Sequence, residues 1–157
     1  MTAHGVRNFV QSRVWNAGTP QALCSVNMPV MVLVVDDSPD SRALYGEYLE
    51  FCGFQVELAS DGEEAVRKVK SAWPAVIIMD LAMPKMDGWE AITRIRANPG
   101  TAAIPIVALS AFAFGDEPDR ARRAGADLCL TKPCLPSQVG RVVRAMLLRR
   151  DVARSSA

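Results

Sequence analysis

Four short apolar runs in this chain each lead directly into a polar or charged side chain. The runs and the residues that end them are Val34-Val35-Asp36-Asp37, Ile77-Ile78-Met79-Asp80, Ala108-Leu109-Ser110 and Leu130-Thr131-Lys132-Pro133. Short apolar runs of this kind are typical of buried strands. Parallel strands joined by crossover helices all end at one edge of a sheet, and open α/β proteins bind their ligands at that edge. We therefore expect three carboxylates, a hydroxyl and an amine to meet at a single edge.

These side chains indicate the chemistry of the expected site. Asp36, Asp37 and Asp80 would repel one another unless a cation joined them, and a divalent metal ion is the simplest such cation. The hydroxyl of Ser110 and the amine of Lys132 are then left to hold an anion. The sequence therefore predicts a metal-dependent site that handles a phosphoryl group.

The whole pattern alternates short apolar runs with amphipathic stretches, which predicts an α/β fold with a five-stranded parallel sheet. Strands are expected over residues 30–35, 54–59, 75–79, 104–109 and 127–130. Helices are expected from Ser38 or Asp40 to about residue 52, from Asp61 to the break at Pro74, and over residues 87–98, 116–124 and 136–150. The first, third and fourth strands are apolar throughout, as parallel strands covered on both faces usually are.

Length, charge and cysteine spacing exclude several classes of protein. A chain of 157 residues can build one ordinary domain, and its net charge of +1 does not favour nucleic acid or an anionic membrane surface. No apolar run approaches the roughly 20 residues that span a bilayer. The four cysteines lack zinc-site spacing, so reduced thiols in a cytoplasmic protein are expected.

We expect a flexible extension over residues 1–28, a folded domain over 29–150 and a fraying polar tail over 151–157.

The motifs in this order resemble the receiver domain of two-component response regulators, and the likeness covers about residues 30–148. It is carried by Asp36-Asp37, the segment from Asp80 to Gly88 (DLAMPKMDG), Ser110-Ala111 and Lys132-Pro133. The resemblance implies a flavodoxin-like (βα)5 fold with strand order 2-1-3-4-5. It also implies that the peptide bond between Lys132 and Pro133 is cis.

The resemblance also implies a role for each residue of the acidic site. Asp80 would accept a phosphoryl group from a histidine kinase or a phosphotransfer protein. Asp37, Asp80 and the backbone carbonyl of Ala82 would bind Mg²⁺, and Asp36 would act mainly through a coordinated water. Mg²⁺ suits such a sparse set of oxygen ligands because it keeps several of its waters.

Two further residues would respond to phosphorylation if the resemblance holds. Lys132 would pair with Asp80 and then with the phosphoryl oxygens, and Ser110 would donate its hydroxyl to the phosphoryl group. The family usually has an aromatic switch residue three positions before the lysine, where this chain has Cys129. Phe112 or Phe114 could take over that role.

The rate at which the phosphoryl group is lost can also be predicted. Ala82 and Phe112 occupy the two positions that tune attack by water on the acyl phosphate in the family. Neither side chain can position a water molecule by hydrogen bonding, so slow autodephosphorylation is expected.

The favoured function is therefore a stand-alone receiver, not an enzyme, that signals to a downstream protein by contact. No direct binding of nucleic acid or membrane is expected, and dimerisation on phosphorylation is left open. An aspartate-nucleophile phosphatase is one alternative, although those enzymes usually carry a DxD pair and Asp36 and Asp37 are adjacent. A flavodoxin-like cofactor binder is disfavoured because the same two acids would repel a flavin phosphate. A binding-only receiver, or one receiver of a larger hybrid kinase, is a further alternative.

Overall fold

The computed structural model describes residues 29–111 and 116–155 of the chain. The extension expected over residues 1–28 lies outside the described residues, and so do Phe112 and Phe114. Within the described ranges, no helix is both long enough and apolar enough to cross a bilayer.

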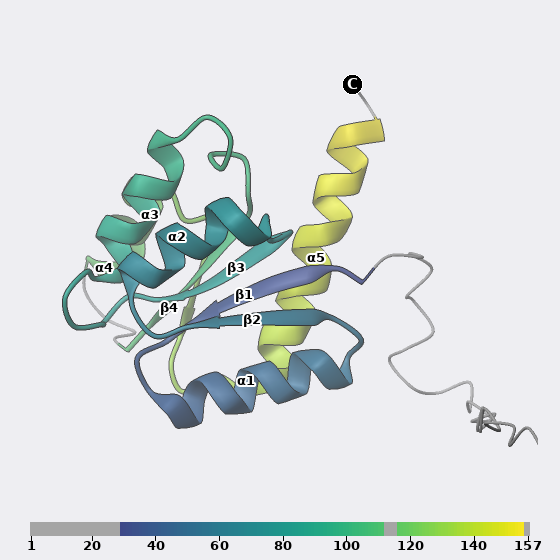
Figure 1. Ribbon diagram of the computed structural model, residues 1–157, viewed down its shortest axis with the longest axis horizontal. Coiled ribbons are helices and arrows are strands. Elements are labelled where there is room, and N and C mark those ends of the chain that lie inside the picture. Colours follow the sequence, from purple (N-terminus) through teal and green to yellow (C-terminus); the bar gives the residue numbers. More distant parts are fainter. Residues whose placement is uncertain (1–28, 112–115, 156–157) are drawn as a thin grey trace, which may run out of the picture.

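Five parallel strands form one sheet in the order β2-β1-β3-β4-β5, which confirms the expected topology (Figure 1). The strands are β1 (Met31–Val35), β2 (Gln55–Ala59), β3 (Val76–Asp80), β4 (Ile106–Ser110) and β5 (Leu128–Thr131). β1, β3 and β4 lie inside the sheet, and β3 and β4 are buried along their whole length. β2 is an edge strand and is only partly buried, which explains why its sequence alternates polar and apolar residues.

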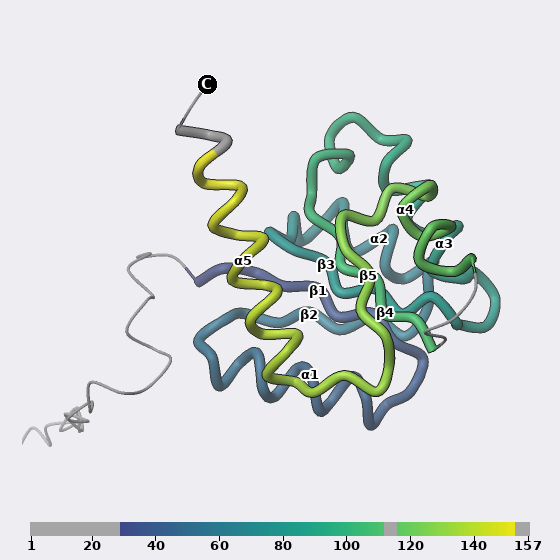
Figure 2. Tube along the Cα trace, turned by 180° about the vertical axis from the view of Figure 1, so that it is seen from behind, coloured from purple at the N-terminus to yellow at the C-terminus, as the bar shows by residue number. Residues whose placement is uncertain are grey.

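Helices cover both faces of the sheet (Figures 1 and 2). They are α1 (Pro39–Phe51), α2 (Gly62–Ala72), α3 (Gly88–Ala97), α4 (Glu117–Ala124) and α5 (Pro136–Ser155). α1 and α5 pack on one face, while α2, α3 and α4 pack on the other. This arrangement places every strand between two layers of helix, as the apolar runs predict.

The core is divided between the two faces because successive strand residues point in opposite directions. Val32 and Val34 of β1 pack with α1 and α5, whereas Leu33 and Val35 pack with α2 and α3. All four side chains are fully buried. Each is worth about 1.5–3 kcal/mol relative to an exposed position, so the sheet is anchored firmly on both faces.

Side chains cap three of the helices at the residues where the sequence pattern starts them. Ser38, rather than Asp40, caps α1 by accepting a hydrogen bond from the amide of Ser41 at 3.3 Å. Asp61 and Asp87 cap α2 and α3 in the same way, at 2.9 Å and 2.8 Å from the donor amides. These caps satisfy backbone donors that a helix leaves free in its first turn.

The predicted end of the last helix near residue 150 is wrong. α5 continues through Asp151 to Ser155, and its final turns extend past the sheet in Figure 1. The segment contains no proline or glycine to stop a helix, so the helix continues where a fraying tail was expected. The guanidinium of Arg150 also donates to the carbonyl of Ala75 at 3.2 Å, which fixes the helix beside the sheet.

Candidate metal centre

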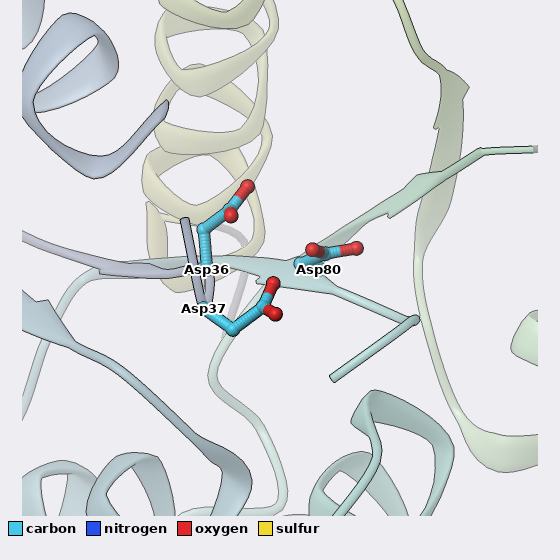
Figure 3. Close-up of side chains that lie close together, drawn as sticks. All are labelled: Asp36, Asp37 and Asp80. Carbon is cyan, nitrogen blue, oxygen red and sulfur yellow. The ribbon is translucent and has the colours of Figure 1, made fainter. Parts of the chain in front are cut away.

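The carboxylates of Asp36, Asp37 and Asp80 lie together at the carboxyl edge of the sheet (Figure 3). One oxygen from each lies within 4.8 Å of the others. β1 and β3 are neighbours with Val35 paired to Met79, so Asp36 follows β1 at the level of Asp80 in β3. The sheet register therefore brings together residues that are 44 positions apart in the sequence (80 − 36).

Two of these three carboxylates are buried. Asp36 is 0% exposed and Asp80 is 4% exposed, while Asp37 faces solvent. Burial raises the pKa of Asp80 above its ordinary value, although the hydrogen bond with Lys132 acts in the opposite direction. A buried carboxylate is costly unless a positive charge accompanies it, so the site requires cations.

Lys132 supplies one positive charge. Its ammonium group lies 2.7 Å from the Oδ2 atom of Asp36 and 3.1 Å from the Oδ2 atom of Asp80. Burial alone would lower the pKa of Lys132, but the bonds to these two carboxylates raise it above its ordinary value. One lysine among three carboxylates leaves a net negative charge, which favours a further cation.

The chain around the carboxylates is held by backbone contacts. The amide of Ala82 donates to Asp80 Oδ1 at 3.1 Å, and the amide of Ser38 donates to Asp36 Oδ1 at 2.9 Å. Arg42 of α1 donates to the carbonyls of Asp36 at 2.6 Å and Asp37 at 3.1 Å. These contacts fix the two strand exits, and the sequence pattern had not singled out Arg42.

Close packing of the loop after β3 depends on Gly88. A Cβ atom at this position would come within 2.3 Å of the Asp80 carbonyl oxygen and 2.7 Å of the Leu81 Cα atom. The amide of Gly88 also donates to the carbonyl of Leu81 at 3.1 Å. The glycine therefore lets the start of α3 fold back against the end of β3.

Ser110 and Lys132 lie on neighbouring strand exits. The amide of Lys132 donates to the carbonyl of Ser110 at 2.7 Å, and the peptide bond before Pro133 is cis as expected. The hydroxyl of the fully buried Ser110 donates to the carboxylate of Glu117, the first residue of α4. Nothing in the sequence pattern distinguished Glu117 from an ordinary acid in the first turn of a helix.

Cys129, which stands where an aromatic residue was expected, lies half-buried in β5 and packs against the α2–α3–α4 side of the core. Burial raises the pKa of its thiol above the ordinary value, and the negative charge of Glu117 adds to the rise. The charge of Glu117 therefore acts on Cys129, and its carboxylate accepts a hydrogen bond from the hydroxyl of Ser110, the other expected switch residue.

The donor set fits Mg²⁺. Three carboxylates offer hard oxygen ligands, which Mg²⁺ prefers, and one of them is exposed enough to leave room for retained waters. Ala82, the fourth expected ligand, follows Asp80 by two residues and is exposed. Asp36, Asp37 and Asp80 are the residues that would hold the ion.

A comparison with protein families identifies the family to which this fold belongs. The model of the response regulator receiver domain matches residues 32–144. This chain belongs to the response regulator receiver family. Receiver domains act in two-component signalling, where they are mainly phosphoacceptors rather than enzymes.

Individual relatives agree with this assignment. A gliding motility regulatory protein of Myxococcus xanthus is 43% identical over 101 residues, which cover 64% of this chain but only 13% of that protein. The chemotaxis response regulator CheY4 of Vibrio cholerae is 32% identical with a TM-score of 0.72, over 76% of this chain and 100% of that one. The receiver therefore corresponds to a small part of one relative and to the whole of another.

A third relative contains a metal ion. It is the receiver domain of a sensor histidine kinase from Pseudomonas aeruginosa PAO1, whose structure has a magnesium ion coordinated in the active site cleft. It is 29% identical to this receiver with a TM-score of 0.71, over 76% of this chain and 98% of that chain. Receiver domains bind Mg²⁺ at an acidic pocket, and this receiver has an acidic cluster.

Proposed function

We propose that this receiver accepts a phosphoryl group on Asp80 from a phosphohistidine of a histidine kinase or a phosphotransfer protein, with Mg²⁺ bound by the acidic cluster. The observation that carries the proposal is the surroundings of Asp80. Its buried carboxylate lies 3.1 Å from the ammonium group of Lys132, beside two further carboxylates that are suited to a metal ion. No other carboxylate in the described ranges belongs to such a cluster.

The proposed reaction transfers the phosphoryl group between two nucleophiles. An oxygen of Asp80 forms a bond to phosphorus while the bond from phosphorus to the donor's imidazole nitrogen breaks. The bonding electrons stay on that nitrogen, and a proton already carried by the other ring nitrogen makes the leaving histidine neutral, so the products are an acyl phosphate and a neutral histidine. A carboxylate attacks a negatively charged phosphoryl group poorly unless charge is neutralised. Bound Mg²⁺ would supply part of that neutralisation.

The residues around Asp80 supply the rest of the chemistry. Lys132 already contacts Asp36 and Asp80, so a short movement of its flexible side chain brings the ammonium group to the phosphoryl oxygens. Ser110 lies on the neighbouring strand exit and supplies a hydroxyl donor. The phosphoryl group of the acyl phosphate carries a charge of about −1.5 to −2, and the hydrogen-bond donors Ser110 and Lys132 would stabilise it.

The output that we propose is contact with a downstream protein in the cytoplasm, without direct binding of nucleic acid or membrane. Ser110 and Cys129 would link the acyl phosphate to α4, β5 and α5, the elements that follow β4 in the chain. The folded unit from residue 29 to the end of α5 would carry out this cycle.

Intact mass spectrometry after incubation with acetyl phosphate and Mg²⁺ tests the phosphoacceptor. We expect one added phosphoryl group, and we expect it to be absent after chelation and in the variant Asp80→Asn. Asp119→Asn, which removes an exposed carboxylate from α4, serves as the matched control and should be phosphorylated normally. An adduct that persists in Asp80→Asn would contradict the assignment.

A further inference from the structure

The contact between Ser110 and Glu117 is a feature that the proposed reaction does not use. Ser110 ends β4 and is fully buried, and Glu117 is the half-buried first residue of α4. The serine hydroxyl donates to the Oε2 atom of the glutamate. Hydrogen bonds to an ionised acceptor are about twice as strong as neutral ones, so this contact is a substantial tie between β4 and α4.

The same hydroxyl is needed elsewhere once Asp80 is phosphorylated. A serine hydroxyl has one proton to donate, so it cannot fully serve the carboxylate of Glu117 and a phosphoryl oxygen at the same time. We propose that Glu117 is a positioning residue that holds the Ser110 hydroxyl in the unphosphorylated receiver and competes with the acyl phosphate for it. This inference rests on the proposed function.

Loss of the contact between Ser110 and Glu117 would reduce the local stability of α4. Glu117 begins the helix, and Arg120, one turn later, places its guanidinium 4.1 Å from the ring centre of Trp89 on α3. α4 has only eight residues, and Ala121 is its buried residue. A short helix with little buried surface depends on such end contacts, so loss of the Ser110–Glu117 bond would loosen its first turn.

The residue at position 129 also supports a role for Glu117 in the switch. The carboxylate of Glu117 accepts a hydrogen bond from the Ser110 hydroxyl, and its negative charge adds to the rise in the pKa of the Cys129 thiol that burial causes. An aromatic residue is expected at that position from the family resemblance, and this receiver has a small thiol there. Glu117 thus provides a polar connection from the β4 exit to α4 that does not require an aromatic side chain.

The first test examines the contact without any phosphorylation. Amide hydrogen exchange of α4 is measured by mass spectrometry in Glu117→Gln, in Ser110→Ala and in Glu63→Gln, which removes an exposed acid from the first turn of α2. We expect exchange in α4 to increase several-fold in the first two variants and to stay unchanged in the third. Unchanged exchange in both Glu117→Gln and Ser110→Ala would overturn the inference.

The second test measures competition with a phosphoryl group. Beryllium fluoride with Mg²⁺ is used as the acyl phosphate mimic, and its affinity is measured by calorimetry. We expect Glu117→Gln to bind it about three- to tenfold more tightly than the wild type, because the weaker acceptor releases the hydroxyl more easily. Glu63→Gln should bind like the wild type.

A double-mutant cycle separates competition from simple charge removal. In the Ser110→Ala background, Glu117→Gln should no longer increase the affinity, because no hydroxyl remains to be released. The same gain in that background would overturn the inference, since it would reflect only the lost negative charge.

If the wild-type receiver binds no beryllium fluoride, the proposed function fails together with the competition. A wild type that binds it while Glu117→Gln gives no gain overturns the inference alone.

Discussion

The ammonium group of Lys132 neutralises only part of the negative charge at the carboxyl edge of the sheet. It lies 2.7 Å from Asp36 and 3.1 Å from Asp80, and both of those carboxylates are buried. A metal ion bound by the same cluster would share these carboxylates with the lysine. Lys132 and the metal ion are therefore expected to stabilise the fold together and to compete for the carboxylates of Asp36 and Asp80.

Lys132→Met tests this balance. Without Mg²⁺ the variant should lose about 2 kcal/mol of stability, because two buried carboxylates lose the hydrogen-bond donor and counter-charge that Lys132 supplies. Mg²⁺ should bind it several-fold more tightly than the wild type and restore most of that stability. Urea unfolding with and without Mg²⁺ measures both effects, and Lys70→Met, at an exposed position of α2, is the control. Equal Mg²⁺ affinity in Lys132→Met and wild type would contradict the expectation that Lys132 and Mg²⁺ compete for the same carboxylates.

The predicted rate at which the phosphoryl group is lost depends on single residues beside Asp80. Ala82 is exposed two positions after Asp80 and has no side-chain group that could orient a water molecule. We predict an acyl phosphate that persists for minutes or longer. Ala82→Asn, which adds an amide able to position water, should shorten the lifetime several-fold when the decay of the phosphorylated mass is followed. Decay of the wild type within seconds would refute this prediction.

At the scale of elements, Glu64 stabilises the junction between β2 and α2. Its carboxylate accepts from the amide and the hydroxyl of Ser60 at 2.8 Å and 2.9 Å, and pairs with Lys68 at 3.1 Å. The hydrogen bond from the Ser60 amide is the largest cause that lowers the pKa of Glu64, which falls from 4.5 to about 2. The ionised form therefore favours the folded state.

The pH dependence follows from the direction of that shift. A lowered pKa in the folded state gives stability above the ordinary pKa of the group, and this stability is lost as pH falls through the folded value. Glu64→Gln should therefore cost about 1–2 kcal/mol at neutral pH, and the difference should shrink as the pH falls from about 4.5 toward about 2. Urea unfolding across this range, with the exposed Glu63→Gln as control, would disprove the account if the difference did not change with pH.

Packing between elements makes a separate prediction at Gly88. Gly88→Ala should lower stability by about 1–3 kcal/mol, because its Cβ would overlap the backbone at the end of β3. Mg²⁺ binding should weaken as well, since Asp80 is the residue displaced. Gly46→Ala, where a Cβ would come 3.3 Å from the Leu58 side chain, is the control and should be tolerated. Wild-type Mg²⁺ affinity in Gly88→Ala would contradict the predicted link to Asp80.

Particular elements show why some features could be predicted from the sequence and others could not. The strand exits were predictable because a buried apolar run ending in Asp36 or Asp80 leaves little choice of structure. The end of α5 was not, because Asp151 and Val152 permit both helix and tail. The bond from Ser110 to Glu117 depends on the path of the chain between β4 and α4, and residue types alone do not determine that path.

At the scale of the whole molecule, the topology makes the site. The order β2-β1-β3-β4-β5 places β3 between β1 and β4, so Asp80 has the two aspartates on one side and Ser110 on the other. β5 then brings Lys132 alongside Ser110. Four strand exits therefore place the proposed nucleophile, the metal ligands and the groups that would donate hydrogen bonds to the phosphoryl oxygens at a single edge of the sheet.

Trapping the acyl phosphate by borohydride reduction tests the central proposal most directly, because reduction converts a phosphorylated aspartate into homoserine at its own position. After treatment with acetyl phosphate, Mg²⁺ and borohydride, peptide mass spectrometry should find homoserine in place of Asp80. The conversion should disappear when Mg²⁺ is chelated. Homoserine in place of another acid such as Asp37, or none at all in folded receiver with Mg²⁺ bound, would contradict the proposal that Asp80 is the phosphoacceptor.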